Sequence, residues 1–215
     1  MARPVQAKRA LRGRFDFITI CIHWLTVVLV LSLIATGLSF DLIGESPVRP
    51  LLFTVHRSLG VSVWIVAWLR LAWRMTHARF PPFAEDMNVV HRWVITLSEY
   101  TLYALLLLQP ITGMTGTLLA GKPFGLFFWT VPALLPRMAD ASVAVLGLHQ
   151  IGASWLIALV GGHAAAALLH HYLAGDDTLK TMAPWVKIRG GYDDRLTLQD
   201  AEATSPSKDL FAATE

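Results

Sequence analysis

Four long apolar stretches dominate the chain, and short segments rich in polar residues and proline separate them. The stretches cover residues 18–40, 51–73, 94–119 and 141–173. A helix needs about 20 apolar residues to cross the hydrocarbon core of a bilayer, and each stretch is at least that long. The pattern predicts an all-α integral membrane protein, a four-transmembrane-helix bundle in the lipid bilayer.

Composition supports this class. Hydrophobic residues make up 54% of the 215 residues and charged residues only 15%, whereas a soluble domain carries about 25% charged residues. We expect residues 1–184 to form one membrane domain, with no room for a second. Residues 185–215 form a polar tail that we expect to be cytoplasmic and disordered.

Basic residues gather on one side of the predicted helices. Five precede the first helix, Arg74, Arg79 and Arg92 lie around the second connection, and Lys180, Lys187 and Arg189 follow the fourth helix. The other two connections carry Arg49, Lys122 and Arg137. Because basic flanks stay in the cytoplasm, both termini are predicted to be cytoplasmic. The net charge of +3 follows from this topology, so we infer no nucleic-acid partner.

Histidines inside the apolar stretches are the candidate functional residues, because ionisable groups are costly in hydrocarbon. The second and fourth helices both run inward from the outer face, which places His56 and His149 at similar depth in the outer half. His163 follows His149 by fourteen residues, a drop of about 21 Å on nearly the same helix face. His163 can therefore pair with His23 of the first helix. Depth in the membrane alone does not exclude His170 as the partner of His23.

Two pairs of imidazoles, one in each leaflet, suit two bis-histidine haems. Gly60 and Gly152 lie on the histidine faces and leave room for a porphyrin edge, although small residues also let membrane helices pack without a cofactor. Zinc fits less well, because clustered cysteine and carboxylate ligands are missing. A haem-free transporter or proton channel that uses the histidines as a relay is a further alternative.

The chain resembles the bacterial cytochrome b561 family from about Phe15 to Pro184. The resemblance is carried by Ile22-His23-Trp24-Leu25, His56-Arg57-Ser58-Leu59-Gly60, Leu69-Arg70-Leu71, Leu102-Tyr103, Pro110-Ile111-Thr112-Gly113, His149, the run from His163 to Tyr172, and Asp177-Thr178-Leu179-Lys180. It implies two haem b groups with iron ligated by His23, His56, His149 and His163, and thereby favours His163 over His170. It also implies a place in the bacterial inner membrane.

The resemblance further implies oxidation of superoxide at the outer face and reduction of ubiquinone. Arg57 and Lys122, ahead of Arg49 and Arg137, are the cations expected to steer superoxide; haem-propionate pairing and interfacial snorkelling are their other expected roles. Where related chains carry a histidine at the inner end of the third helix, this chain has Glu99. We expect Glu99 either to pair with Arg70 or to deliver protons to quinone.

A different function remains open, namely an electron-transfer subunit that docks a periplasmic dehydrogenase or hydrogenase as its protein redox partner. The short outer connections offer little docking surface, which counts against it. Residues 120–140, which are rich in phenylalanine and proline, are expected to lie in the outer membrane interface, as an anchor or a binding element.

Overall fold

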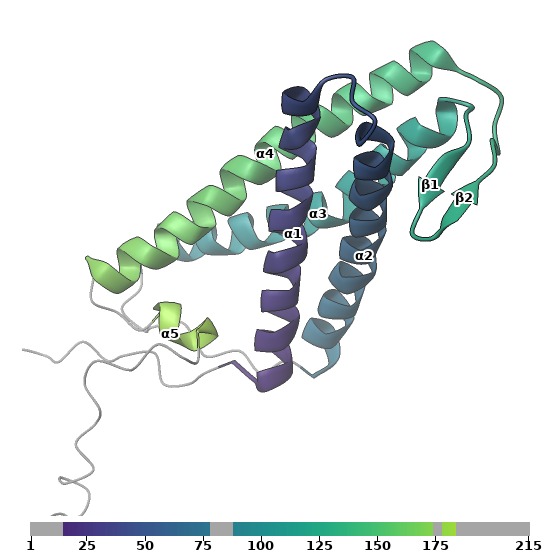
Figure 1. Cartoon of the computed structure of the whole chain (residues 1–215). Helices are drawn as coiled ribbons and strands as arrows, with labels where there is room; N and C mark the ends of the chain where they lie inside the picture. Colours follow the sequence, from purple (N-terminus) through teal and green to yellow (C-terminus); the bar gives the residue numbers. More distant parts are fainter. Residues whose placement is uncertain (1–14, 78–87, 174–177, 184–215) are drawn as a thin grey trace, which may run out of the picture.

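The computed structural model describes residues 15–77, 88–173 and 178–183. Its four long helices are α1 (Phe17–Ile43), α2 (Arg49–Thr76), α3 (Val89–Leu119) and α4 (Ala139–Tyr172) (Figure 1). All four are long and apolar enough to cross a membrane, which confirms the predicted class. Several helices extend beyond the apolar stretches, because polar residues continue a helix after it leaves the hydrocarbon; α3, for example, begins at Val89 rather than Val94.

A short antiparallel hairpin between α3 and α4 was not predicted. Its strands are β1 (Phe124–Leu126) and β2 (Trp129–Val131). The hairpin lies against α2: the backbone N–H of Phe127 donates to Ser58 Oγ at 2.6 Å, and Gly125 contacts Thr54 so closely that a Cβ would not fit. The aromatic residues of the hairpin therefore differ in exposure: Phe124 is buried, whereas Phe128 is 96% exposed.

The long helices pair unevenly. Helix α1 packs along α2, and α3 packs along α4, whereas α4 approaches α1 and α2 at few points in the described residues. The apolar core is a central layer formed by Val30, Val63, Ala67 and Leu106. We call the end of the bundle beside β1 and β2 the hairpin end, and the opposite end the α5 end (Figure 1).

Polar contacts tie the helices together at the α5 end. Asp16 caps the start of α1 through the N–H of Thr19 and also accepts from the indole of Trp73 at the end of α2, at 2.9 and 3.1 Å. Helix α5 (Thr178–Met182) returns to α1, where the indole of Trp24 donates to the carbonyl of Met182 at 2.7 Å.

Some sequence predictions fall outside the described residues. These are the tail at 185–215, the basic residues that precede α1, and Arg79, Asp177, Lys187 and Arg189.

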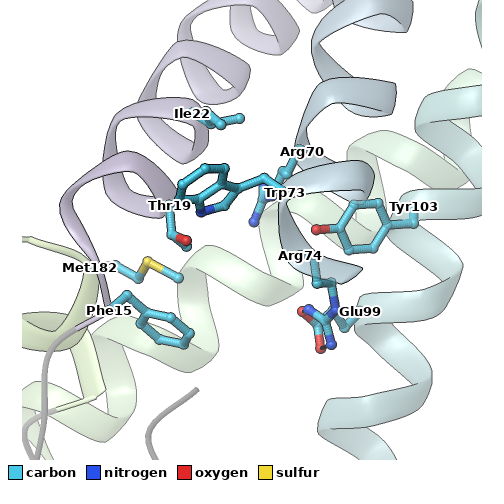
Figure 2. Close-up of a pocket in the computed structure, with 9 residues that line it drawn as sticks. All are labelled: Phe15, Thr19, Ile22, Arg70, Trp73, Arg74, Glu99, Tyr103 and Met182. Atoms are coloured by element: carbon cyan, nitrogen blue, oxygen red, sulfur yellow. Dashed lines mark hydrogen bonds and ion pairs between the residues drawn. The ribbon is translucent and has the colours of Figure 1, made fainter. Parts of the chain in front are cut away.

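An ion pair joins α2 to α3 near the α5 end. Both carboxylate oxygens of Glu99 accept hydrogen bonds from the guanidinium of Arg74 (Figure 2). The predicted pairing of Glu99 with Arg70 is therefore wrong. Helix α2 continues to Thr76, so Arg74 is a helical residue rather than part of a connection, and it reaches the level of Glu99. Arg70 lies one turn earlier, with its guanidinium 5.5 Å from the centre of the Tyr103 ring.

The free energy of unfolding should reveal this pairing. In a double-mutant cycle, Glu99→Gln and Arg74→Gln should couple by about 0.5–1 kcal/mol, since both side chains are partly exposed. The measurement is denaturant unfolding of the detergent-solubilised protein. The matched control replaces Arg74→Gln with Arg70→Gln and should show smaller coupling to Glu99→Gln. Equal coupling to both arginines would contradict the assignment.

Candidate functional site

Two pairs of histidines face each other across the space between α4 and its neighbours. Near the hairpin end, His56 of α2 and His149 of α4 have ring centres 6.3 Å apart and planes at 88°. Nearer the α5 end, His23 of α1 and His163 of α4 have ring centres 6.5 Å apart and planes at 61°. The structure thus brings together His56 and His149, which depth and helix direction paired, and it places His163, one of the two candidates that depth left open, opposite His23.

Both spacings fit one metal atom between two rings. An imidazole nitrogen lies about 2.0 Å from a bound metal, so two rings that ligate it from opposite sides have centres about 6 Å apart. No group of three or more metal-binding side chains occurs in the part of the chain that the structure describes. Each pair therefore offers two ligands, and a macrocycle such as porphyrin would supply the others. This donor set fits haem better than a zinc site built from protein ligands alone.

Hydrogen bonds orient the rings of the hairpin-end pair. The Nδ1 atom of His56 lies 2.9 Å from Thr36 Oγ1 of α1, and the Nδ1 atom of His149 lies 3.0 Å from the backbone carbonyl of Gln109 in α3. With Nδ1 engaged, Nε2 of each ring is left for a metal, the arrangement expected of a ligating histidine. Thr36 and Gln109 were not singled out in the sequence, because the acceptors come from other helices.

Glycines determine how much space is left around these rings. A Cβ at Gly60 would meet nothing within 4 Å, so open space adjoins α2 one turn after His56. A Cβ at Gly113 would lie 2.9 Å from the His149 ring, so only glycine lets that ring approach α3. Gly152 lies directly against the side chain of Gln109 and thus permits close packing of α4 on α3. Gly113 belongs to the motif Pro110-Ile111-Thr112-Gly113, but the positions of these residues in the sequence do not indicate a contact with His149.

Arg57 is an uncompensated cation at the hairpin end. Its guanidinium carbon lies 5.3 Å from the centre of the Phe53 ring and 5.4 Å from that of Phe124, so hairpin and helix hold it between two aromatic faces. No carboxylate pairs with it among the described residues, whereas Arg49 pairs with Glu45 at 2.8 Å. Lys122, exposed just before β1, adds positive charge at the same end.

A pocket with a largely apolar lining and several charged or hydrogen-bonding side chains lies at the α5 end. Its walls come from α1, α2, α3 and α5, and it is lined by Phe15, Thr19, Ile22, Arg70, Trp73, Arg74, Glu99, Tyr103 and Met182 (Figure 2). Arg70 also acts electrostatically on both His23 and His163. It has no carboxylate partner among the described residues.

The remaining described histidines have other neighbours. His170 faces His91 of α3, with ring centres 5.1 Å apart, closer than two rings on opposite sides of one metal. His77 ends α2 and stacks on Trp73 at 4.8 Å. His77 is the first residue after α2, whereas His91 lies in the first turn of α3, which begins earlier than the apolar pattern indicates. The geometry pairs His163, rather than His170, with His23.

Comparison with known proteins agrees with this arrangement. Residues 14–185 match the model of the family described as prokaryotic cytochrome b561. The chain is 27% identical to the probable superoxide oxidase CybB of Yersinia pestis, over 82% of this chain and 98% of the relative. It is 26% identical to cytochrome b561 homolog 1 of Escherichia coli (strain K12), over 80% and 98%. It is 29% identical to homolog 2 of the same organism, over 79% and 90%.

The family match contains all four long helices and both histidine pairs. Histidine is among the residues that ligate haem iron in proteins, so the histidine pairs are compatible with a family that binds haem b. On this match, the chain belongs to the prokaryotic cytochrome b561 family, whose members are multi-pass membrane proteins that bind haem b and transfer electrons.

Proposed function

We propose that this chain is a di-haem b cytochrome that carries electrons across the bacterial inner membrane, with the hairpin end outside. His56 and His149 hold the outer haem, and His23 and His163 hold the inner one. The observation that carries the proposal is the presence of two imidazole pairs, 6.3 and 6.5 Å apart, that lie toward opposite ends of the bundle.

The chain's residues favour electron transfer over oxygen activation. The paired histidines would hold the haems, which would supply a one-electron couple, and iron held by two histidines would have no site left for oxygen. Gly60 leaves space for a macrocycle beside His56, and Gly152 brings α3 close enough for Gln109 to reach His149. Arg70, near the α5-end pair and not matched by a carboxylate among the described residues, is placed to neutralise a haem propionate.

Superoxide is the proposed electron donor. It is a small anion, and Arg57 and Lys122 provide positive charge at the hairpin end, with Arg57 adjacent to His56 in sequence. The name of the Yersinia pestis relative, a probable superoxide oxidase, supports this choice. Each superoxide gives up one electron and leaves as dioxygen, so two superoxides supply the two electrons that reduce one quinone.

Ubiquinone is the proposed acceptor, and its reduction to quinol takes two electrons and two protons. A quinone headgroup needs an apolar slot with a few hydrogen-bonding groups. The pocket at the α5 end has this character, with Tyr103 and Arg70 beside Ile22 and Met182. Glu99 lines the same pocket, but its two-fold hydrogen bonding to Arg74 favours a structural role over proton delivery.

Docking of a protein redox partner is the second candidate function. Phe128 is 96% exposed and Trp129 is 70% exposed at the hairpin, and exposed aromatic residues suit either a protein interface or a membrane interface. Reduction of the purified protein by superoxide alone would favour the first function, since no partner would then be needed.

Haem ligation can be tested by replacing each histidine. His23→Ala, His56→Ala, His149→Ala and His163→Ala should each lose or perturb one haem and leave the other, because the two pairs share no ligand. Haem per protein and the low-spin absorption spectrum are the measurements. His170→Ala and His77→Ala are the controls and should keep both haems. Loss of a haem in His170→Ala together with two intact haems in His163→Ala would overturn the inner pairing.

Electrostatic steering of superoxide predicts a salt dependence. The Debye length falls from about 30 Å at 0.01 M to about 8 Å at 0.15 M salt, so haem reduction by superoxide should slow several-fold over this range. Arg57→Gln or Lys122→Gln should slow it at low salt and flatten the dependence. The measurement is stopped-flow absorbance, with reduction by an uncharged quinol as the salt-independent control. A rate indifferent to salt and to both substitutions would remove steering.

A further inference from the structure

The two histidine pairs have similar spacing but different hydrogen bonding. At the hairpin end, Nδ1 of each ring has an oxygen within reach: Thr36 Oγ1 for His56 and the carbonyl of Gln109 for His149. At the α5 end, Nδ1 of His23 is buried with no hydrogen-bond partner. His163 likewise has none among the residues that the structure describes.

The local geometry fixes which group donates at the hairpin end. The hydroxyl of Thr36 lies 2.9 Å from the carbonyl of Ser32 and 3.0 Å from that of Leu33, so its proton is directed to its own helix. The hydroxyl oxygen is then free to accept from Nδ1–H of His56. The carbonyl of Gln109 has no proton to give, so His149 donates to it. The hydroxyl of Thr112 donates to the same carbonyl at 2.9 Å, so its oxygen, 3.2 Å from Nδ1 of His149, is a second acceptor.

These hydrogen bonds change the ligands themselves. An imidazole that donates its second N–H becomes a more basic metal ligand. A more electron-rich ligand favours the oxidised iron and lowers the reduction potential, because hydrogen bonding around a redox site tunes that potential. Rings without an acceptor, as at the α5 end, stay weaker donors and leave the potential higher.

Nearby charge does not cancel this difference. A cation favours the reduced iron, and Arg70 acts on both rings of the α5-end pair. Arg57 acts on His56 at the hairpin end. Arg70 thus acts on two rings and Arg57 on one, so nearby charge does not oppose the difference that hydrogen bonding creates.

We propose that Thr36, together with the Gln109 carbonyl, is a positioning and tuning element that holds the hairpin-end haem at a lower potential than the α5-end haem. Electrons then pass from the hairpin end to the α5 end with a favourable free-energy change. The proposal rests on the haem ligation proposed above, which the same samples test separately.

The test is an equilibrium redox titration of the purified full-length protein, followed by haem absorbance. Thr36→Val keeps the side-chain shape and removes the hydroxyl acceptor, so that only the Leu33 backbone remains to bond His56. It should raise the lower of the two midpoint potentials while leaving the upper one in place. We expect a several-fold change in the reduction equilibrium constant, where tenfold corresponds to about 59 mV for one electron.

Two controls isolate the hydroxyl. Thr36→Ser keeps the acceptor and should retain both wild-type midpoints. Thr117→Val removes a comparable α3 hydroxyl, which bonds to the carbonyl of Gly113, and should also change neither midpoint. Thr36→Ala carries the same expectation as Thr36→Val and replaces it if valine disturbs haem retention.

The outcomes separate the two proposals. Two low-spin haems per chain with a lower midpoint that stays fixed or falls in Thr36→Val and Thr36→Ala, or a shift confined to the upper midpoint, would overturn the tuning role. Haem content other than two low-spin haems in the unmodified protein would instead overturn the ligation.

Discussion

An imidazole inside hydrocarbon has no water to satisfy it, and this cost determines how the bundle is arranged. The four histidines lie in two pairs, and each pair spans the space between α4 and another helix at 6.3 or 6.5 Å. Helix α4 therefore cannot close on α1 and α2 as α3 closes on α4. What remains for direct apolar packing is the central layer around Val63 and Ala67, the most buried residues of the core.

The hairpin end shows how the rest of the chain adapts to this constraint. The hairpin covers α2 beside His56, where Phe124 is buried and Gly125 fits against Thr54. Arg57 is held between Phe53 and Phe124 and cannot turn freely toward water. A cation fixed by aromatic rings keeps its charge available to an approaching anion at a smaller entropic cost than a free side chain would need.

The sequence was sufficient for features that depend on depth and insufficient for features that depend on helix ends and rotation. Hydropathy predicted four helices, and the fourteen-residue interval between His149 and His163 predicted two levels. Hydropathy does not mark where a helix ends in polar residues, so Arg74 was assigned to a connection and Arg70 was paired with Glu99. Thr36 and Gly113 depend on the relative rotation of neighbouring helices, which no single helix encodes. The hairpin was hidden because its aromatic residues also suit a membrane interface.

Directional electron transfer needs a difference between sites that share the same ligands. Each end of the bundle has one arginine matched by a carboxylate, Arg49 with Glu45 and Arg74 with Glu99. Each also has one arginine near its histidine pair without such a match in the described residues, Arg57 or Arg70. Arg70 acts on both rings of its pair and Arg57 on one ring of the other, so nearby charge does not oppose a difference between the two ends. Among the described residues, only the hairpin-end rings have acceptors on Nδ1. Backbone and hydroxyl acceptors do not ionise, so a difference in potential that they create would persist at any pH at which the fold persists.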